Sequence, residues 1–239
     1  MGKFIGLNWK LNPKTKKEAI NLSNFCDKKG IVIFPPFIFL DSLKQSLKKA
    51  KLGAQNVFWE ENGAFTGEVS PIMLKKLGVE YVLIGHSERR RFFGETSKII
   101  NKKIKQSLTA QLKVVLCVGE TKEIRKSGIK FVKNYLQQEL SRDLEKIKVS
   151  ELIVAYEPFW AIGSGKADNP QESAQIIGFI KDFLKMKNVL NYKVIYGGSI
   201  NSKNVFAFSS FDIIDGVLVG KASLEKSELK KIFSAFYVS

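Results

Sequence analysis

Short apolar runs recur along the whole chain, and segments with helical spacing lie between them. Parallel strands that are covered on both faces are apolar without alternation. A repeated strand followed by an amphipathic helix builds a parallel sheet. Eight such runs are present, at residues 3–8, 30–34, 51–56, 81–85, 113–119, 151–157, 193–198 and 216–220. The pattern therefore predicts an α/β fold with parallel strands.

The segments between the runs, such as 96–111 and 130–147, have apolar residues at three- and four-residue steps, which is typical of amphipathic helices. Eight strand–helix units in a chain of 239 residues match a closed (β/α)8 barrel. An open, doubly wound sheet is the competing architecture on pattern alone. No low-complexity stretch or Pro/Ser-rich linker divides the chain, so we expect a single domain over residues 1–239.

The composition is globular, with 44% hydrophobic and 26% charged residues. The chain has no apolar run of about 18 residues that could cross a bilayer, and its start has no basic region followed by an apolar core. We therefore expect no membrane attachment, no secretory signal and a cytoplasmic location. Cys26 and Cys117 are far apart in sequence and His86 is the only histidine, so we expect no disulfide framework and no metal.

The formal net charge of +16 could indicate a partner with negative charge, such as a nucleic acid. However, 34 of the 39 basic residues are lysines, and they are spread over the polar faces of the predicted helices. Proteins that read nucleic acids more often use clustered arginines. We expect a solvated lysine-rich surface with a general attraction for anions and no specific nucleic-acid partner, and a genuine polyanion site is the alternative.

Polar residues follow the apolar runs directly. In a (β/α)8 barrel the catalytic groups come from the C-terminal ends of several strands, which meet at one rim. The residues found at these ends are Asn8, Lys10, Gln55, Asn56, His86, Glu120, Glu157, Gly197–Ser199, Gly220 and Lys221. The pattern therefore predicts an active site at that rim.

Glu157 ends the sixth run and precedes Pro158, which disfavours the helical conformation at the glutamate. A carboxylate covered by apolar residues is poorly solvated and becomes a better general base. A surface glutamate at a strand end is the alternative. The following segment 158–166, PFWAIGSGK, has an apolar middle and two glycines, as expected of a lid that closes over a ligand, although an ordinary turn would also fit.

His86 stands directly before Ser87 and Glu88, two residues that favour a helix start. Amides at a helix start disfavour the imidazole cation, so His86 is expected to be neutral and to donate a hydrogen bond. A structural histidine is the alternative. Lys10 is either a fixed cation that faces an anionic substrate or a Schiff-base nucleophile.

The stretches YGGSI and VLVGKASL follow the seventh and eighth runs, where barrels commonly bind phosphate with loop amides. Ser199, Gly220 and Lys221 are the candidates there. Plain glycine turns are the alternative.

Together these stretches resemble the triosephosphate isomerase family. The matching stretches are NWKLN, GAQN, GAFTGE, IGHSERR, CVGE, AYEPFWAIGSGK, YGGSI and GVLVGKASL, in the family's order over nearly the whole chain. The resemblance implies a TIM barrel and a cofactor-independent interconversion of dihydroxyacetone phosphate and D-glyceraldehyde 3-phosphate through an enediolate. The reaction serves glycolysis and gluconeogenesis and borders the pentose phosphate shunt.

The resemblance also implies residue roles. Glu157 would move a proton between two carbons, neutral His86 would polarise the carbonyl, and Lys10 would stabilise negative charge. The catalytic residues implied are Glu157, His86, Lys10, Asn8 and Glu88, with Glu88 expected to hold Lys10 and the base in position. The substrate-binding residues implied are Asn8, Lys10, Gly163, Ser199, Gly220 and Lys221.

Two positions depart from the family. Lys221 stands where a second glycine is usual, and Phe159 replaces a smaller residue at the first hinge of the lid. Two other functions remain open: a Schiff-base aldolase that uses Lys10, and a catalytically silent relative that binds polyanions through its basic surface.

The segment 59–70, WEENGAFTGEVS, resembles the loop that this family buries in a second subunit, with Thr66 directed toward the partner's active site. The resemblance therefore implies a homodimer. Phe65 would form an apolar loop tip that needs cover.

Overall fold

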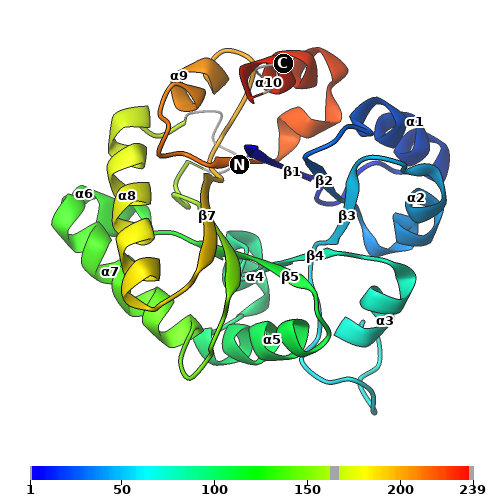
Figure 1. The fold of residues 1–239 in the computed structure, drawn as a ribbon, viewed down its shortest axis with the longest axis horizontal. Coiled ribbons are helices and arrows are strands. Elements are labelled where there is room, and N and C mark those ends of the chain that lie inside the picture. Colours follow the sequence, from blue (N-terminus) through cyan, green and yellow to red (C-terminus); the bar gives the residue numbers. More distant parts are fainter. Residues whose placement is uncertain (1, 162–166, 237–239) are drawn as a thin grey trace.

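The computed structural model describes residues 2–161 and 167–236. Its strands form a closed parallel barrel in which each strand pairs with the next and the first pairs with the last (Figure 1). The strands are β1 (Phe4–Asn8), β2 (Ile31–Phe34), β3 (Lys51–Ala54), β4 (Tyr81–Ile84), β5 (Lys113–Val118), β6 (Glu151–Tyr156), β7 (Asn191–Tyr196) and β8 (Gly216–Val219). The pairing of β1 with β8 confirms the predicted (β/α)8 barrel over the open sheet.

Helices surround the barrel and connect successive strands (Figure 1). The helices are α1 (Lys16–Cys26), α2 (Leu40–Ser46), α3 (Pro71–Leu77), α4 (Ser87–Phe93), α5 (Ser97–Thr109), α6 (Lys122–Lys126), α7 (Ile129–Asp143), α8 (Pro170–Met186), α9 (Val205–Ser209) and α10 (Lys226–Phe236), with the short 3-10 turns η1 (Phe37–Phe39) and η2 (Lys221–Leu224). Helices α5 and α7 correspond to the two amphipathic segments predicted from apolar spacing. In the described ranges, no helix is long and apolar enough to cross a membrane.

Local chemistry sets where the helices begin. At α8 the side chain of Asn169 accepts hydrogen bonds from the backbone N–H groups of Gln171 and Glu172, and Pro170 occupies the first helical position. Proline is favoured there because it has no N–H to leave unpaired and its φ already suits a helix. The pair Asn169–Pro170 therefore sets the start of α8.

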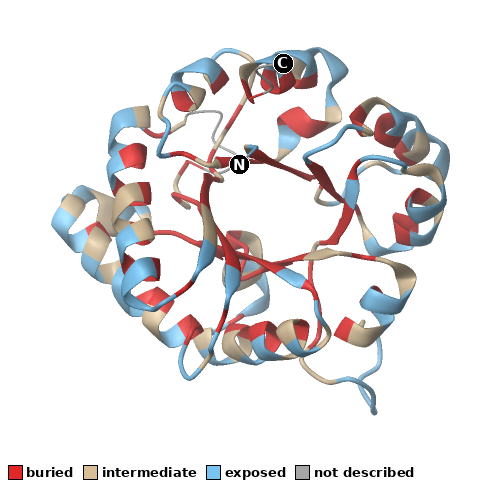
Figure 2. Cartoon of the chain, in the orientation of Figure 1, coloured by how far each residue is buried: buried red, intermediate tan, exposed pale blue. Residues whose placement is uncertain are grey.

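The apolar side chains form two layers. One layer lies between the strands and the helices, whose buried faces point toward the barrel and whose exposed faces point outward (Figure 2). The other fills the barrel interior and consists of Phe4, Val32, Phe34, Leu83, Val115, Cys117, Ile153, Ala155, Ile195 and Leu218. The interior is tightly filled at Gly53, where an added Cβ would lie 2.3 Å from the ring of Phe34. The barrel interior is therefore a packed core, and a ligand can bind only at the ends of the barrel.

Candidate active site

A cavity of about 620 Å³ opens at the C-terminal end of the strands. This volume is typical of a small-molecule site. Predicted residues from five strand ends meet in its lining, namely Asn8, Lys10, His86, Glu157, Ser199, Gly220 and Lys221. Of the other strand-end residues, Gln55, Asn56 and Glu120 lie outside this lining. Gln55 and Glu120 instead form hydrogen bonds with the backbone of the neighbouring loops.

Glu157 lies at the end of β6 and only 1% of its surface is exposed. Its backbone N–H donates to the carbonyl of Val118 at 2.7 Å, and its Oε2 accepts a hydrogen bond from the backbone N–H of Ser87 at 3.1 Å. Its Oε1 has no hydrogen-bond partner among the described residues. It lies 3.4 Å from Nε2 of His86. One carboxylate oxygen is thus anchored by a backbone N–H, and the other lies beside the imidazole in the cavity lining.

His86 is 6% exposed and caps the start of α4. The backbone N–H of Glu88 donates to its Nδ1 at 3.2 Å, so Nδ1 acts as an acceptor and carries no proton. A neutral ring with its proton on Nε2 fits this arrangement. That Nε2 lies 3.4 Å from Oε1 of Glu157, and both residues line the cavity.

Lys10 adopts a left-handed backbone conformation with φ of 54°, which is uncommon for a residue with a side chain. Two neighbours stabilise it. The backbone N–H of Lys10 donates to Oδ1 of Asn8 at 3.0 Å, and Nε2 of Gln55 donates to the carbonyl of Lys10 at 2.8 Å. Gln55 also donates to the carbonyl of Phe34 at 2.8 Å. The strained turn presents the Lys10 side chain to the cavity.

Glu88 pairs with Lys10 across a distance of 2.5 Å between Oε1 and Nζ. Its second oxygen lies 3.7 Å from Nδ1 of His86. Within the described ranges Glu88 makes no direct contact with Glu157. Glu88 therefore contacts Lys10 directly, and its expected effect on the base stays a prediction.

Two neighbours of Glu157 make contacts with it that the sequence analysis did not predict. Gly197 follows β7, and a Cβ added there would lie 2.8 Å from Cγ of Glu157. The thiol of Cys117, on β5, lies within hydrogen-bonding reach of the same carboxylate, and burial raises the pKa of the thiol well above its ordinary value. No local pattern reveals these two contacts, because only the closed barrel brings β5, β6 and β7 side by side.

Glu120 lies fully buried beneath the start of the predicted lid. Its Oε1 accepts hydrogen bonds from the hydroxyl of Tyr156 and from Nε1 of Trp160, both at 3.1 Å. Its carbonyl accepts a hydrogen bond from the backbone N–H of Phe159 at 3.0 Å. Burial raises the pKa of Glu120, and the bonds from Trp160 and Tyr156 oppose this effect. Glu120 therefore anchors the chain where it leaves β6.

Ser199, Gly220 and Lys221 lie together at the side of the cavity formed after β7 and β8. The hydroxyl of Ser199 donates to the carbonyl of Ala161 at 2.7 Å, which ties this side to the start of the predicted lid. Lys221 is exposed and begins η2. Gly163 and the remainder of the predicted lid, 162–166, lie outside the described residues. In the part of the chain that is described, no group of three His, Cys, Asp or Glu side chains could hold a metal ion.

Comparison with known proteins agrees with this geometry. Residues 3–236 match the family model described as triosephosphate isomerase. A triosephosphate isomerase from Dehalococcoides mccartyi is 44% identical over 242 residues, which cover 96% of this chain and 94% of the relative. Relatives of the same name from Dictyoglomus thermophilum and Aquifex aeolicus are 43% and 38% identical, and cover 93% and 99% of this chain and 95% and 100% of their own lengths. The chain belongs to the triosephosphate isomerase family.

Proposed function

We propose that this chain interconverts dihydroxyacetone phosphate and D-glyceraldehyde 3-phosphate with Glu157 as the catalytic base. The observation that carries the proposal is the free Oε1 of Glu157, buried in the cavity and 3.4 Å from Nε2 of His86. The reaction is that of a triose-phosphate isomerase and serves glycolysis and gluconeogenesis. We also propose that the protein is cytoplasmic and that its reaction lies beside the pentose phosphate shunt.

The reaction begins when Glu157 removes a proton from the carbon next to the substrate carbonyl. The electron pair of that C–H bond moves into the carbonyl and gives an enediolate. Glu157 then returns the proton to the neighbouring carbon, so base and substrate end in their starting protonation states. Glu157 is 1% exposed, and this burial favours the step because it limits the access of solvent to the carboxylate.

His86 supplies the hydrogen bond that polarises the carbonyl. Its Nε2 faces the free oxygen of Glu157 at 3.4 Å, so a substrate carbon held at Glu157 places its oxygens near the imidazole. Donation from Nε2 stabilises the negative oxygen of the enediolate. The same nitrogen moves the hydroxyl proton between the two oxygens, as the isomerisation requires.

Lys10 adds positive charge beside the reacting oxygens. Its Nζ is held by Glu88 at 2.5 Å and its backbone by Asn8. This contact engages Nζ with a carboxylate, whereas a Schiff-base nucleophile needs a free amine. The contact therefore favours isomerisation over the aldolase alternative.

The phosphate of the substrate is proposed to lie against Ser199, Gly220 and Lys221, and Gly163 is proposed to add a backbone amide. The backbone amides offer hydrogen bonds and the Lys221 side chain adds a cation to the same end of the cavity. Holding a non-reacting phosphate fixes the reacting carbons at Glu157.

The test is turnover of D-glyceraldehyde 3-phosphate by purified protein in the presence of a chelator and without added nucleotide. Formation of dihydroxyacetone phosphate is expected. Glyceraldehyde, which has the same reacting carbons but no phosphate, is expected to react with a much lower kcat/KM. Folded protein that fails to convert the phosphorylated triose would overturn the proposed reaction.

A homodimer through the 59–70 loop is the second part of the proposal. This loop projects from the barrel near α3 (Figure 1). Phe65 packs on Phe58 with ring centroids 4.7 Å apart but is still 43% exposed, and Thr66 at the tip is exposed as well. An apolar ring on a projecting loop is explained if a second subunit covers it.

Light scattering after size exclusion tests the dimer. The wild type is expected at twice the mass of one chain, and Phe65→Ser is expected to shift toward the monomer at low concentration. Phe131→Ser is the matched control, because Phe131 is 59% exposed on α7, outside the loop. A wild-type monomer, or equal dissociation of both variants, would contradict this role of the loop.

A further inference from the structure

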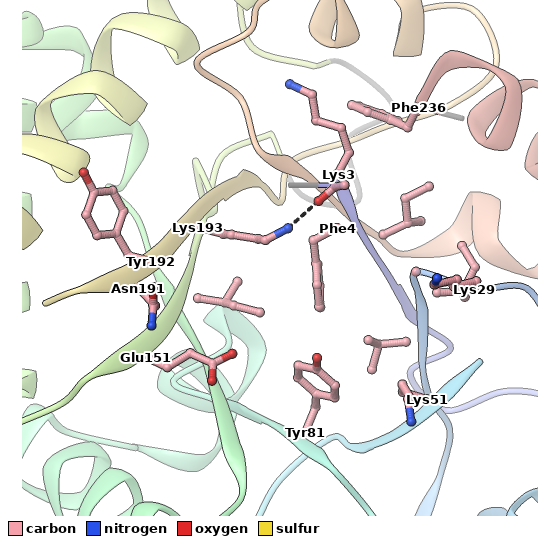
Figure 3. A pocket seen from close by; sticks show the side chains of 16 residues that line it. Lys3, Phe4, Lys29, Lys51, Tyr81, Glu151, Asn191, Tyr192, Lys193 and Phe236 are labelled. Carbon is pink, nitrogen blue, oxygen red and sulfur yellow. Dashed lines mark hydrogen bonds between the residues drawn. The ribbon is translucent and has the colours of Figure 1, made fainter. Parts of the chain in front are cut away.

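A second cavity, of about 700 Å³, opens at the opposite end of the barrel (Figure 3). We call it the basal pocket and define it by Lys3, Phe4, Lys51, Tyr81, Glu151 and Lys193, which lie at the N-terminal ends of strands or directly before one. No described residue lines both cavities. Glu151 of the basal pocket and Glu157 of the catalytic cavity are six residues apart along β6 and its end, which is about 20 Å of extended chain at about 3.3 Å per residue.

The floor of the basal pocket is apolar and aromatic. The rings of Phe4 and Tyr81 lie 5.7 Å apart at an angle of 56°, and Val32 and Ile153 continue this surface. The hydroxyl of Tyr81 points toward the middle of the pocket (Figure 3). Burial raises the pKa of Tyr81, so the phenol keeps its proton at neutral pH and can donate a hydrogen bond. The floor fits a flat apolar group that carries a polar end.

The rim of the basal pocket carries more positive than negative charge. The carboxylate of Glu151 already pairs with Lys113 at 3.0 Å, and Lys51 pairs with Glu80 at 2.8 Å. Lys193 differs from these, because its Nζ donates to the backbone carbonyl of Gly2 (Figure 3). Among the described residues, no carboxylate forms an ion pair with Lys193.

The charge of Lys193 is poorly compensated. Burial is the strongest influence on this ammonium and lowers its pKa, and the positive charge of Lys3 acts in the same direction. Asp215 and, more weakly, Glu151 oppose them. The oxygens of Asp215 already bond Nζ of Lys181 at 2.9 Å and the backbone N–H of Val194 at 2.7 Å, and Glu151 already pairs with Lys113. A negative group bound beside Lys193 would offset the cost of this partly buried charge.

We propose that the basal pocket binds a small aromatic carboxylate, with its carboxylate at Lys193 and its ring on Phe4 and Tyr81. The volume of the pocket falls in the usual range of small-molecule sites, about 300–1,000 Å³. The site is independent of the reaction at the other end of the barrel.

Calorimetric titration with cinnamate, a flat aromatic carboxylate, tests the proposal. Its uncharged amide, cinnamamide, has nearly the same shape and isolates the contribution of the charge. Cinnamate is expected to bind one site at least about tenfold more tightly than cinnamamide, because a charge-assisted hydrogen bond contributes that much affinity. Lys193→Gln is expected to weaken cinnamate by about tenfold and to leave cinnamamide unchanged.

Two variants serve as controls. Lys105→Gln removes the same charge from an exposed position on α5 and is expected to bind cinnamate as the wild type does. Lys10→Met alters the catalytic cavity and is also expected to keep full binding. Unchanged isomerase activity and circular dichroism of Lys193→Gln show that this variant is folded.

Three results would overturn the proposal. The first is an absence of cinnamate binding to the wild type, and the second is equal affinity for cinnamate and cinnamamide. The third is cinnamate binding that survives in Lys193→Gln or is lost in Lys10→Met, because it would place the ligand outside the basal pocket.

Discussion

The backbone N–H of Ser87 donates to Oε2 of Glu157 at 3.1 Å and joins residues 70 positions apart. The bond connects the first residue of α4 to the end of β6. Because His86 directly precedes Ser87, the same turn positions both the imidazole and the carboxylate. The relative placement of base and hydrogen-bond donor therefore depends on one short turn.

Replacement of His86 by Gln tests the imidazole. The amide keeps a polar side chain but cannot move a proton between the two oxygens. We expect kcat to fall by about 10²–10³ with a small change in KM, the usual size of a lost acid–base or electrostatic group. Steady-state kinetics measure the effect, and an unchanged kcat would mean that another group polarises the carbonyl.

Gly197→Ala tests the space around the base. The new methyl would lie 2.8 Å from Cγ of Glu157, so the carboxylate must shift. We expect kcat to fall by about 10²-fold, which is the cost of a displacement of about 1 Å. Gly178→Ala on α8 is the control, since its methyl meets only the end of the Ile213 side chain, at 3.1 Å. Equal activity of both variants would contradict the close fit at Glu157.

Variants of Lys10 and Glu88 separate the effect of the positive charge of Lys10 from the effect of its position. Lys10→Met removes the cation, and we expect kcat/KM to fall by about 10²-fold or more as one charge-assisted contact to the substrate is lost. Glu88→Gln keeps the cation but weakens the 2.5 Å contact that holds it, so a smaller loss is expected. If Glu88→Gln lost as much kcat/KM as Lys10→Met, Glu88 would have a role beyond holding the lysine.

The buried cluster around Arg90 predicts a pH dependence of stability. Arg90 lies 3.3 Å from Glu139 and 2.7 Å from Asp143, so two carboxyl groups share one guanidinium. Burial raises the pKa of Glu139 from 4.5 to about 8. Between pH 4.5 and about 8, the folded chain therefore keeps a proton on Glu139 that the unfolded chain releases. Glu139 thus makes folding less favourable as the pH rises through this range.

Urea unfolding of the wild type and Glu139→Gln across this pH range checks the sign. The free energy of unfolding of the wild type is expected to decrease relative to that of the variant as pH approaches 8. The comparison cancels the contributions of the other titrating groups. Parallel curves for the two proteins would show that Glu139 is ionised in the fold throughout.

The apolar runs located six of the eight strands to within one residue at each end, whereas β3 and β7 differ from their runs by two residues. The run 51–56 predicted a longer β3, whereas the strand ends at Ala54 because the side chain of Gln55 turns to bond the carbonyls of Lys10 and Phe34. Conversely, β7 begins at Asn191, before its apolar run, because the backbone N–H of Asn191 bonds the carbonyl of Ser150. Both differences arise from partners distant in sequence.

At the active site, too, the sequence indicated residues at strand ends but did not reveal partners that are distant in sequence. Glu157 and His86 were predictable because each follows a strand, and parallel strands end at one rim. The hydrogen bond from Ser87 and the nearby thiol of Cys117 were not predictable, since neither residue type nor spacing reports which side chains meet after barrel closure. The role of Glu120 was likewise hidden, because its position after β5 indicated the rim, whereas the structure places it beneath Trp160.

The role of Glu157 as the base is tested most directly by turnover of D-glyceraldehyde 3-phosphate in deuterium oxide, with the wild type compared with Glu157→Gln. The proton on a carboxylate exchanges with solvent, so the wild-type product is expected to carry deuterium on the carbon that receives it. In Glu157→Gln, isomerisation and deuterium incorporation are expected to fall together by about 10³-fold or more. Isomerisation by Glu157→Gln at a rate close to that of the wild type would contradict the assignment of Glu157 as the base.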